Sequence, residues 1–162
     1  MFRHLVTCRT ALCTALSLSN WFSKLTLYRL VHLQVGDSAE ITKTFTQNDV
    51  KLFSELTGDT NPLHLDEAFA KNTRFGKPIV HGILLNGLVS AVLGTKLPGE
   101  GCVLVSQDIS FTAPLHAGQE VVARAEVKTL KRSVVFMSVS CIATESGQTL
   151  MEGTVKLLIP EN

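Results

Sequence analysis

The stretch of sequence that decides the fold is residues 78–94, which read PIVHGILLNGLVSAVLG. Apolar side chains occupy nearly every side of the helix that these residues would form. A helix that is apolar all round is normally buried in the interior of a protein. We therefore expect residues 78–94 to form a helix that the rest of the chain covers on most sides.

The hydrophobic pattern changes its period after this helix. Beyond Pro98 and Gly99, apolar residues alternate with polar ones, as they do in a strand with one buried face. Short polar segments at residues 117–119, 131–133 and 146–148 predict turns. The pattern thus predicts an antiparallel meander of four strands, at residues 103–112, 120–130, 134–144 and 150–158.

A strand and a helix are expected ahead of the buried helix. Residues 39–46 alternate loosely, as a strand does. Thr46 can cap a helix that ends at Gly58, with Asp49 as its partner in a capping box. Apolar residues at helical spacing predict the face of this helix that joins the core: Val50, Phe53 and Leu56.

Residues 58–66, with the sequence GDTNPLHLD, are predicted to form a loop. Asn61 precedes Pro62, and a residue in that position is disfavoured in helical conformation. A second short helix is expected over residues 66–70, because Asp66 can meet the unpaired N–H groups of its first turn.

These elements describe a sheet that must cover one very apolar helix. We therefore predict an α+β fold in which a curved antiparallel sheet wraps around a central buried helix, the hot-dog arrangement. A doubly wound α/β fold is disfavoured, because no helices separate the last four strands.

Composition narrows the class of protein. The chain has 162 residues, of which 45% are hydrophobic and 18% charged, so a sizeable core is available. The formal net charge of +1 argues against a dedicated nucleic-acid-binding domain. The sequence contains no apolar run near the roughly 20 residues that a membrane span needs.

The first 35 residues differ from the rest of the chain. They contain no acidic residue, and four basic ones lie among Ser, Thr and Leu: Arg3, Arg9, Lys24 and Arg29. This composition is typical of a mitochondrial transit peptide, which would leave residues 36–162 as the folded domain. A secretory signal or a structured amphipathic helix is the alternative.

The four cysteines give no sign of a disulfide framework or a zinc site. Cys8 and Cys13 would leave with a transit peptide. Cys102 and Cys141 stand far apart in strand-like surroundings and outside any C-x-x-C spacing. We expect both to be buried, reduced thiols.

The loop at residues 58–66 carries the first candidate chemistry. Asp59 and His64 can point into one cleft and hold a single water, with a proton accepted by one group and donated by the other. A purely structural histidine is the alternative. A metal site would have to use Asp59, His64, Asp66 and His81, whose spacing is a poor ligand framework.

A narrow polar stripe on the buried helix is the second candidate. Gly82, Asn86 and Ser90 recur at every fourth position. Gly82 stands at the expected helix start, where its N–H could form an oxyanion hole for a carbonyl gaining enolate character. Close helix packing explains the same glycine equally well, and Ser90 could bond back to its own helix.

Residues 57–90, with the sequence TGDTNPLHLDEAFAKNTRFGKPIVHGILLNGLVS, resemble the hydratase-2 signature of the MaoC-like (R)-specific enoyl-thioester hydratases. With the transit-like segment in front, the chain is similar to mitochondrial dehydratases of fatty acid synthesis. The resemblance implies a reversible dehydration of (3R)-hydroxyacyl thioesters to trans-2-enoyl thioesters, without a metal or another cofactor.

The resemblance also implies roles for individual residues. It makes Asp59 and His64 the catalytic pair, Gly82 the donor to the thioester carbonyl, and Ser90 an orienting hydroxyl near the aspartate. The residues expected to bind the substrate are Asn61, Ile83, Leu84 and Asn86.

The expected partners follow from the same chemistry. The substrate would be an acyl thioester of acyl carrier protein or coenzyme A, and a second copy of the chain would cover the sheet edge as a homodimer. Two other functions remain open for a hot-dog domain. One is an acyl thioesterase, and the other is a non-catalytic subunit that binds acyl groups or scaffolds a partner.

Overall fold

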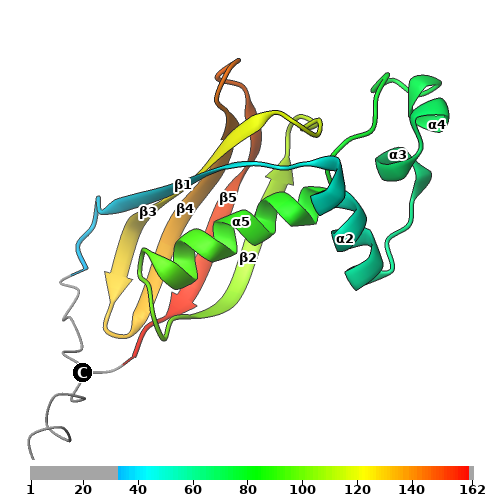
Figure 1. The fold of residues 1–162 in the computed structure, drawn as a ribbon. Coiled ribbons are helices and arrows are strands. Elements are labelled where there is room, and N and C mark those ends of the chain that lie inside the picture. The colour runs from blue at the N-terminus through cyan, green and yellow to red at the C-terminus, as the bar shows by residue number, and fades with distance from the viewer. Residues whose placement is uncertain (1–32, 161–162) are drawn as a thin grey trace, which may run out of the picture. The chain divides into compact units, whose positions relative to one another are not determined.

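A computed structural model describes residues 33–160 and shows an antiparallel sheet curved around one long helix (Figure 1). This helix is α5 (Gly82–Thr95), and the order of the strands is β1-β3-β4-β5-β2. The predicted α+β hot-dog arrangement is confirmed. The strands are β1 (Ser38–Thr44), β2 (Val103–Phe111), β3 (Glu120–Lys131), β4 (Val134–Ala143) and β5 (Thr149–Leu158).

The four strands after α5 do not form the expected simple meander. Strands β3, β4 and β5 pair in chain order, but β2 pairs with the far side of β5, and β1 lies beside β3. The predicted bounds of these four strands differ from the observed ones by no more than one residue at either end. The meander prediction was wrong at β2, because alternation identifies a strand without identifying its partner.

The core lies between the inner face of the sheet and α5. Buried and exposed residues alternate along β3, and the small side chains of Ala123 and Ala125 are completely buried there. Small residues on a central strand let a helix approach closely. The side chains that α5 contributes to this core are Leu85, Leu88, Val89, Val92 and Leu93.

Helix α5 is buried along one face, whereas the sequence predicted burial on most sides. Ile83 is 59% exposed, and Gly87 and Ser90 on the same side are also exposed. The neighbouring strand β2 is open as well, and its apolar Val103 is 58% exposed. An all-round apolar helix indicates that burial is favourable, but not that one chain provides all of it.

Helix α2 (Gln47–Thr57) begins as predicted and buries a different face. The Thr46 hydroxyl accepts from the Asp49 N–H at 3.1 Å, and the Asp49 carboxylate accepts from the Thr46 N–H at 2.8 Å, which completes the capping box. Leu56, predicted to join the core, is 84% exposed, and the polar Ser54 is buried instead.

A short helix, α3 (Pro62–Leu65), occupies part of the segment predicted to be a loop. Proline fits the first position of a helix, where its missing N–H has no intrahelical partner to lose. Asn61 before it stays outside the helix as the N-cap, and its side-chain oxygen accepts from the Leu63 N–H at 3.1 Å. The rule against helix before proline therefore applied to Asn61 and not to the residues that follow.

Helix α4 (Glu67–Lys71) agrees with the second predicted short helix. Its N-cap is Asp66, whose carboxylate accepts from the Phe69 N–H at 3.0 Å. The capping role predicted for this carboxylate is confirmed.

The two described cysteines are free thiols. Cys141 is buried, and burial raises the pKa of its thiol to about 12. Cys102 is only half-buried, and its thiol donates to the Leu93 carbonyl oxygen at 3.2 Å. Burial also raises the pKa of the Cys102 thiol. A thiol with a raised pKa is a poor nucleophile, so neither side chain suggests redox chemistry.

The predicted transit peptide, residues 1–35, lies outside the described residues apart from its last three. Within residues 33–160, the structure contains no helix long and apolar enough to cross a lipid bilayer.

Candidate active site

Asp59 lies in the turn that leads from α2 to α3. Gly58 ends α2 in the left-handed conformation, with a φ of 80°, and so turns the chain sharply. The Asp59 carbonyl oxygen accepts from the buried Ser54 hydroxyl at 2.6 Å. Its carboxylate accepts from the Asn61 N–H at 3.3 Å, while the side chain remains 50% exposed. The backbone of Asp59 is thus held by a buried side chain, while its carboxylate stays half exposed.

His64 lies on α3 and is buried. Its Nδ1 lies 2.7 Å from the carbonyl oxygen of Ile79, the residue two positions before His81. A carbonyl oxygen can only accept, so Nδ1 carries the proton. In the neutral imidazole, Nε2 is then the free acceptor, which is the form a general base requires.

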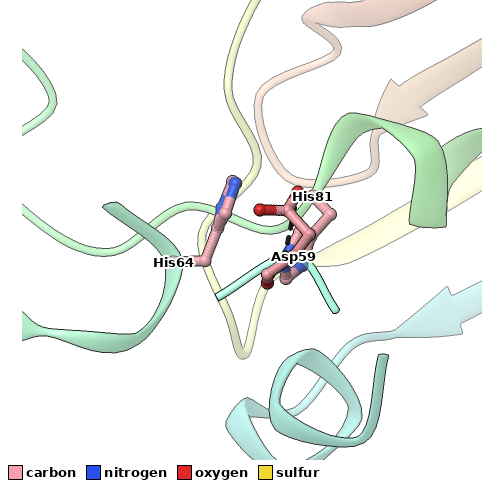
Figure 2. Close-up of side chains that lie close together, drawn as sticks. All are labelled: Asp59, His64 and His81. Carbon is pink, nitrogen blue, oxygen red and sulfur yellow. Dashed lines mark hydrogen bonds and ion pairs between the residues drawn. The ribbon is translucent and has the colours of Figure 1, made fainter. Parts of the chain in front are cut away.

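A third side chain, His81, completes the cluster (Figure 2). Its ring stacks on the His64 ring, with centroids 3.8 Å apart and planes inclined by 28°. Its Nε2 lies 3.3 Å from the Asp59 carbonyl oxygen and 3.8 Å from the Asp59 carboxylate. Burial lowers the pKa of His81, and the neighbouring His64 acts in the same direction, whereas the contacts with Asp59 oppose the shift.

The spacing within the cluster suits a bridging water. One carboxylate oxygen of Asp59 and one ring nitrogen each of His64 and His81 lie within 4.8 Å of one another. A water that makes two hydrogen bonds of about 2.8 Å at a roughly tetrahedral angle joins partners about 4.6 Å apart. One water can therefore contact both the carboxylate and the imidazole.

The same geometry is poor for a metal ion. Zinc needs its nitrogen ligands at about 2.0–2.1 Å and arranged around a single point. Two stacked imidazoles direct their in-plane lone pairs side by side, and the planes of His64 and His81 are only 28° apart. Asp66, the fourth residue considered as a ligand, caps α4 instead.

The N-terminus of α5 lies beside this cluster, because His81 is its N-cap residue. His81 makes no side-chain capping bond, so the first N–H groups of the helix have no side-chain cap. Gly82 is the first helical residue, and a Cβ at this position would lie 2.9 Å from the Phe111 ring. Glycine thus permits a close approach to a helix start that retains free donors and a favourable dipole.

A pocket of about 360 Å³ adjoins this helix start. Gly82 lines it together with mostly apolar side chains, and Arg74 supplies a positive charge. The other lining residues include Phe75, Ile79, Ile83, Leu85 and Phe111.

The structure brings together Asp59, His64 and, through His81, Gly82. Ser90 is two turns farther along α5, about 12 Å from Gly82 by helix geometry. It is exposed, and its hydroxyl has no hydrogen-bond partner within residues 33–160. Its predicted role beside the aspartate stays a prediction.

The four residues predicted to bind the substrate lie in four different environments. Ile83 lines the pocket, and Leu84 packs against the core. The Asn86 side chain donates to the Gln107 oxygen at 3.1 Å and so links α5 to β2. Asn61 caps α3 through its side chain and holds Asp59 through its N–H. Substrate contacts of these four residues remain predictions.

Sequence reasoning missed Ser54 and considered His81 as a ligand of a metal site with poor spacing. Ser54 follows the buried Val50 by four positions and so lies on the same face of α2, and this spacing was the available signal. A buried hydroxyl needs a partner, and here the partner is the Asp59 carbonyl oxygen.

Comparison with known proteins places the chain in a family. A family model described as a MaoC like domain matches residues 34–149. An (R)-specific enoyl-CoA hydratase from Rhodospirillum rubrum is 38% identical over 136 residues, which cover 84% of this chain and 94% of that protein. A mitochondrial 3-hydroxyacyl-[acyl-carrier-protein] dehydratase from Arabidopsis thaliana is 28% identical over 132 residues, covering 79% of this chain and 78% of that protein.

Solved structures agree with the sequence comparison. The (R)-hydratase from A. caviae, described as involved in PHA biosynthesis, superposes with a TM-score of 0.77 at 38% identity, covering 80% of this chain and 99% of that one. The unliganded R-hydratase PhaJ1 from Pseudomonas aeruginosa gives a TM-score of 0.75 at 35% identity, covering 80% of this chain and 84% of that one. Because the family model and these relatives span most of residues 33–160, the chain belongs to the MaoC-like family of hydro-lyases.

Proposed function

We propose that this MaoC-type hydro-lyase dehydrates (3R)-hydroxyacyl thioesters to trans-2-enoyl thioesters, reversibly, in mitochondrial fatty acid synthesis. One observation carries the proposal: a carboxylate and an imidazole lie within 4.8 Å of each other, beside the start of a helix without a side-chain cap. Elimination of water needs these three parts, namely an acid, a base and a donor to the thioester oxygen.

Asp59 and His64 share the proton transfers. In dehydration one of them removes the α-proton and the other protonates the departing 3-hydroxyl group, and hydration reverses both steps. The bond between His64 and the Ile79 carbonyl leaves Nε2 of His64 free to accept a proton.

The Gly82 N–H stabilises the enolate-like oxygen of the thioester. This N–H has no intrahelical acceptor, and the helix dipole favours negative charge at this end. One oxyanion donor is typically worth about 10²–10³ in rate. The adjoining apolar pocket accommodates the acyl chain next to the reacting carbonyl.

The carrier is acyl carrier protein or coenzyme A, whose thioesters share a phosphopantetheine arm. Arg74 is the charged residue of the pocket that adjoins Gly82, and it supports binding of an anionic carrier group. The two relatives differ in the carrier that their names give. The hydratase from Rhodospirillum rubrum is named for coenzyme A, and the dehydratase from Arabidopsis thaliana is named for acyl carrier protein.

A homodimer completes the molecule. Strand β2 is a sheet edge, and an open edge with apolar side chains invites pairing with a second chain. The exposed apolar side chains on and beside this edge include Ile83, Val103, Leu104, Val105 and Phe111. A second copy that covered them would also bury the open face of α5.

A mitochondrial location is supported by two independent observations. The first 35 residues lack acidic side chains and contain four basic ones, as an imported transit peptide does. The relatives from Arabidopsis thaliana and Solanum lycopersicum, at 28% and 30% identity, are named as mitochondrial dehydratases. Residues 36–162 would then be the mature hot-dog domain.

The test follows the absorbance of a trans-2-enoyl thioester in the presence of the purified protein. We expect rapid loss of the conjugated double bond, a (3R)-alcohol as product, and a loss of about 10²–10⁴-fold in folded Asp59→Ala and His64→Ala variants. Release of free thiol with the double bond intact would instead identify a thioesterase. Binding without turnover would identify a non-catalytic subunit, and either result would refute the proposal.

A further inference from the structure

Two buried side chains on different helices hold the backbone of Asp59. The Ser54 hydroxyl, on α2, donates to the Asp59 carbonyl oxygen at 2.6 Å. Nε2 of His81, the N-cap residue of α5, lies 3.3 Å from the same oxygen. Each of these two side chains is 2% exposed. Because a carbonyl oxygen has two lone pairs, it can accept both bonds at once. Asp59 is thereby tied to α2 and α5.

The surroundings of His81 favour a neutral imidazole with its proton on Nε2. The Asp59 carbonyl oxygen only accepts, so the proton is on Nε2. Nδ1 is buried without a partner among the described residues. An unpaired buried N–H at Nδ1 would add a desolvation cost, which the unprotonated nitrogen avoids in part. His81 therefore brings a donor and an aromatic ring to the site rather than a charge.

The ring of His81 restrains the other member of the catalytic pair. It stacks on His64 at 3.8 Å between centroids, and Phe53 packs against it at 4.9 Å with a tilt of 54°. The position of the His64 ring is fixed at its edge by the Ile79 carbonyl and on one face by His81. A single buried residue thus contacts both Asp59 and His64.

We infer that Ser54 and His81 are positioning residues, which hold Asp59 and His64 in their reactive arrangement without touching the substrate. The inference rests on the proposed function, because it assigns a role within that reaction. Asp59 needs such support, since its carboxylate is half exposed and its bond to the Asn61 N–H is 3.3 Å long. A displacement of about 1 Å in a reacting group can cost about 10²-fold in rate.

The test separates the donor from the ring. His81→Phe keeps an aromatic ring and removes the donor, whereas His81→Gln places an N–H near the position of Nε2. Ser54→Ala removes the second donor. We expect Ser54→Ala and His81→Phe each to lower kcat about 10- to 100-fold with KM nearly unchanged, and His81→Gln to recover most of the loss. Combining Ser54→Ala with His81→Phe should cost less than the product of the two losses, because both act through one oxygen.

Thr95→Ala is the matched control. It removes a hydroxyl that donates to the Ala91 carbonyl oxygen at 2.7 Å, in the last turn of α5. We expect its kcat to equal that of the wild type, with rates corrected for the folded fraction from thermal unfolding. The inference is overturned if His81→Phe leaves kcat unchanged, if it raises KM alone, or if His81→Gln is as slow as His81→Phe.

A second measurement keeps this inference separate from the proposed function. If the wild-type protein does not turn over the enoyl thioester, the proposed function fails, but the restraint on Asp59 can still be measured by amide hydrogen exchange. Residues 58–61 should then exchange faster in Ser54→Ala and His81→Phe than in Thr95→Ala. Equal exchange in all three variants would overturn the inference independently of any activity.

Discussion

The core under the sheet and the site at the start of α5 follow opposite rules. Between α5 and the sheet, the buried side chains are apolar. The buried polar side chains in residues 33–160 are Ser54, His64 and His81, and all three lie around Asp59. Burying a polar group is unfavourable unless it is bonded, so three of them at one point suggest selection for function. Core substitutions should therefore change stability, and site substitutions should change activity.

The largest expected effect tests the core side of this comparison. Leu157 on β5 is completely buried and does not line the pocket beside Gly82. Leu157→Ala should lower the free energy of unfolding by about 2–5 kcal/mol, because it removes apolar contacts and leaves a cavity. Chemical denaturation measures this loss. The kcat of the folded fraction should stay at the wild-type value, and a fall in kcat would show that core and site are coupled.

Two glycines on α5 allow a position at the site to be compared with a position away from it in the same helix. At Gly82 a Cβ would meet the Phe111 ring at 2.9 Å, whereas at Gly87 it would meet nothing within 4 Å. Gly82→Ala must displace this ring beside the oxyanion position, at a cost of about 1–3 kcal/mol. We expect kcat/KM for the enoyl thioester to fall in Gly82→Ala. Gly87→Ala should keep its activity, and equal losses in both variants would assign the effect to α5 as a whole.

Much of the fold could be predicted because it depends on local periodicity. The strand bounds and the Thr46–Asp49 capping box follow from side-chain patterns within a few residues of each other. The partner of β2 could not be predicted this way, since pairing with β5 depends on contacts between distant segments. The open face of α5 was missed for a related reason: hydrophobicity measures the tendency to be buried and does not identify the covering surface.

The same distinction between local and long-range information applies to the site residues. Asp59, His64 and Gly82 could be predicted because they stand in one gapless stretch that resembles a known signature. The shared oxygen that joins Ser54 to His81 could not, because these residues are 27 positions apart in the chain and meet only in the fold. Leu56 was predicted to face inward and Ser54 was missed for a similar reason, since a period alone places an apolar residue inward by default.

The pH dependence of stability tests the neutral state of His81. Its pKa is lowered in the folded protein from an ordinary value of 6.5, mainly by burial. As the pH falls below that value, the unfolded chain takes up a proton that the folded chain resists, so stability decreases. His81→Gln should remove this contribution, and its stability should fall less steeply between about pH 7 and pH 5. Asp59 and His64, which face His81, remain in both proteins and serve as a common background. Parallel curves would contradict a neutral His81.

The smallest effect tests a region that supports the site without belonging to it. The Thr46 N–H and hydroxyl hold the Asp49 carboxylate and lower its pKa below the ordinary value of 3.8. This bond stabilises α2 fully above that value, and its contribution is lost as the pH falls through the lowered pKa. Asp49→Asn should therefore cost about 1 kcal/mol at pH 7, as loss of a helix cap does, and less in acid near the pKa of Asp49. Urea denaturation at both pH values measures the difference, and a penalty that did not change with pH would contradict the role of the carboxylate charge. Helix α2 also carries Ser54, which bonds the Asp59 carbonyl oxygen. An unchanged kcat in Asp49→Asn would therefore show that the position of Asp59 depends on the buried contacts of Ser54 and His81 and not on the capping box at the start of α2.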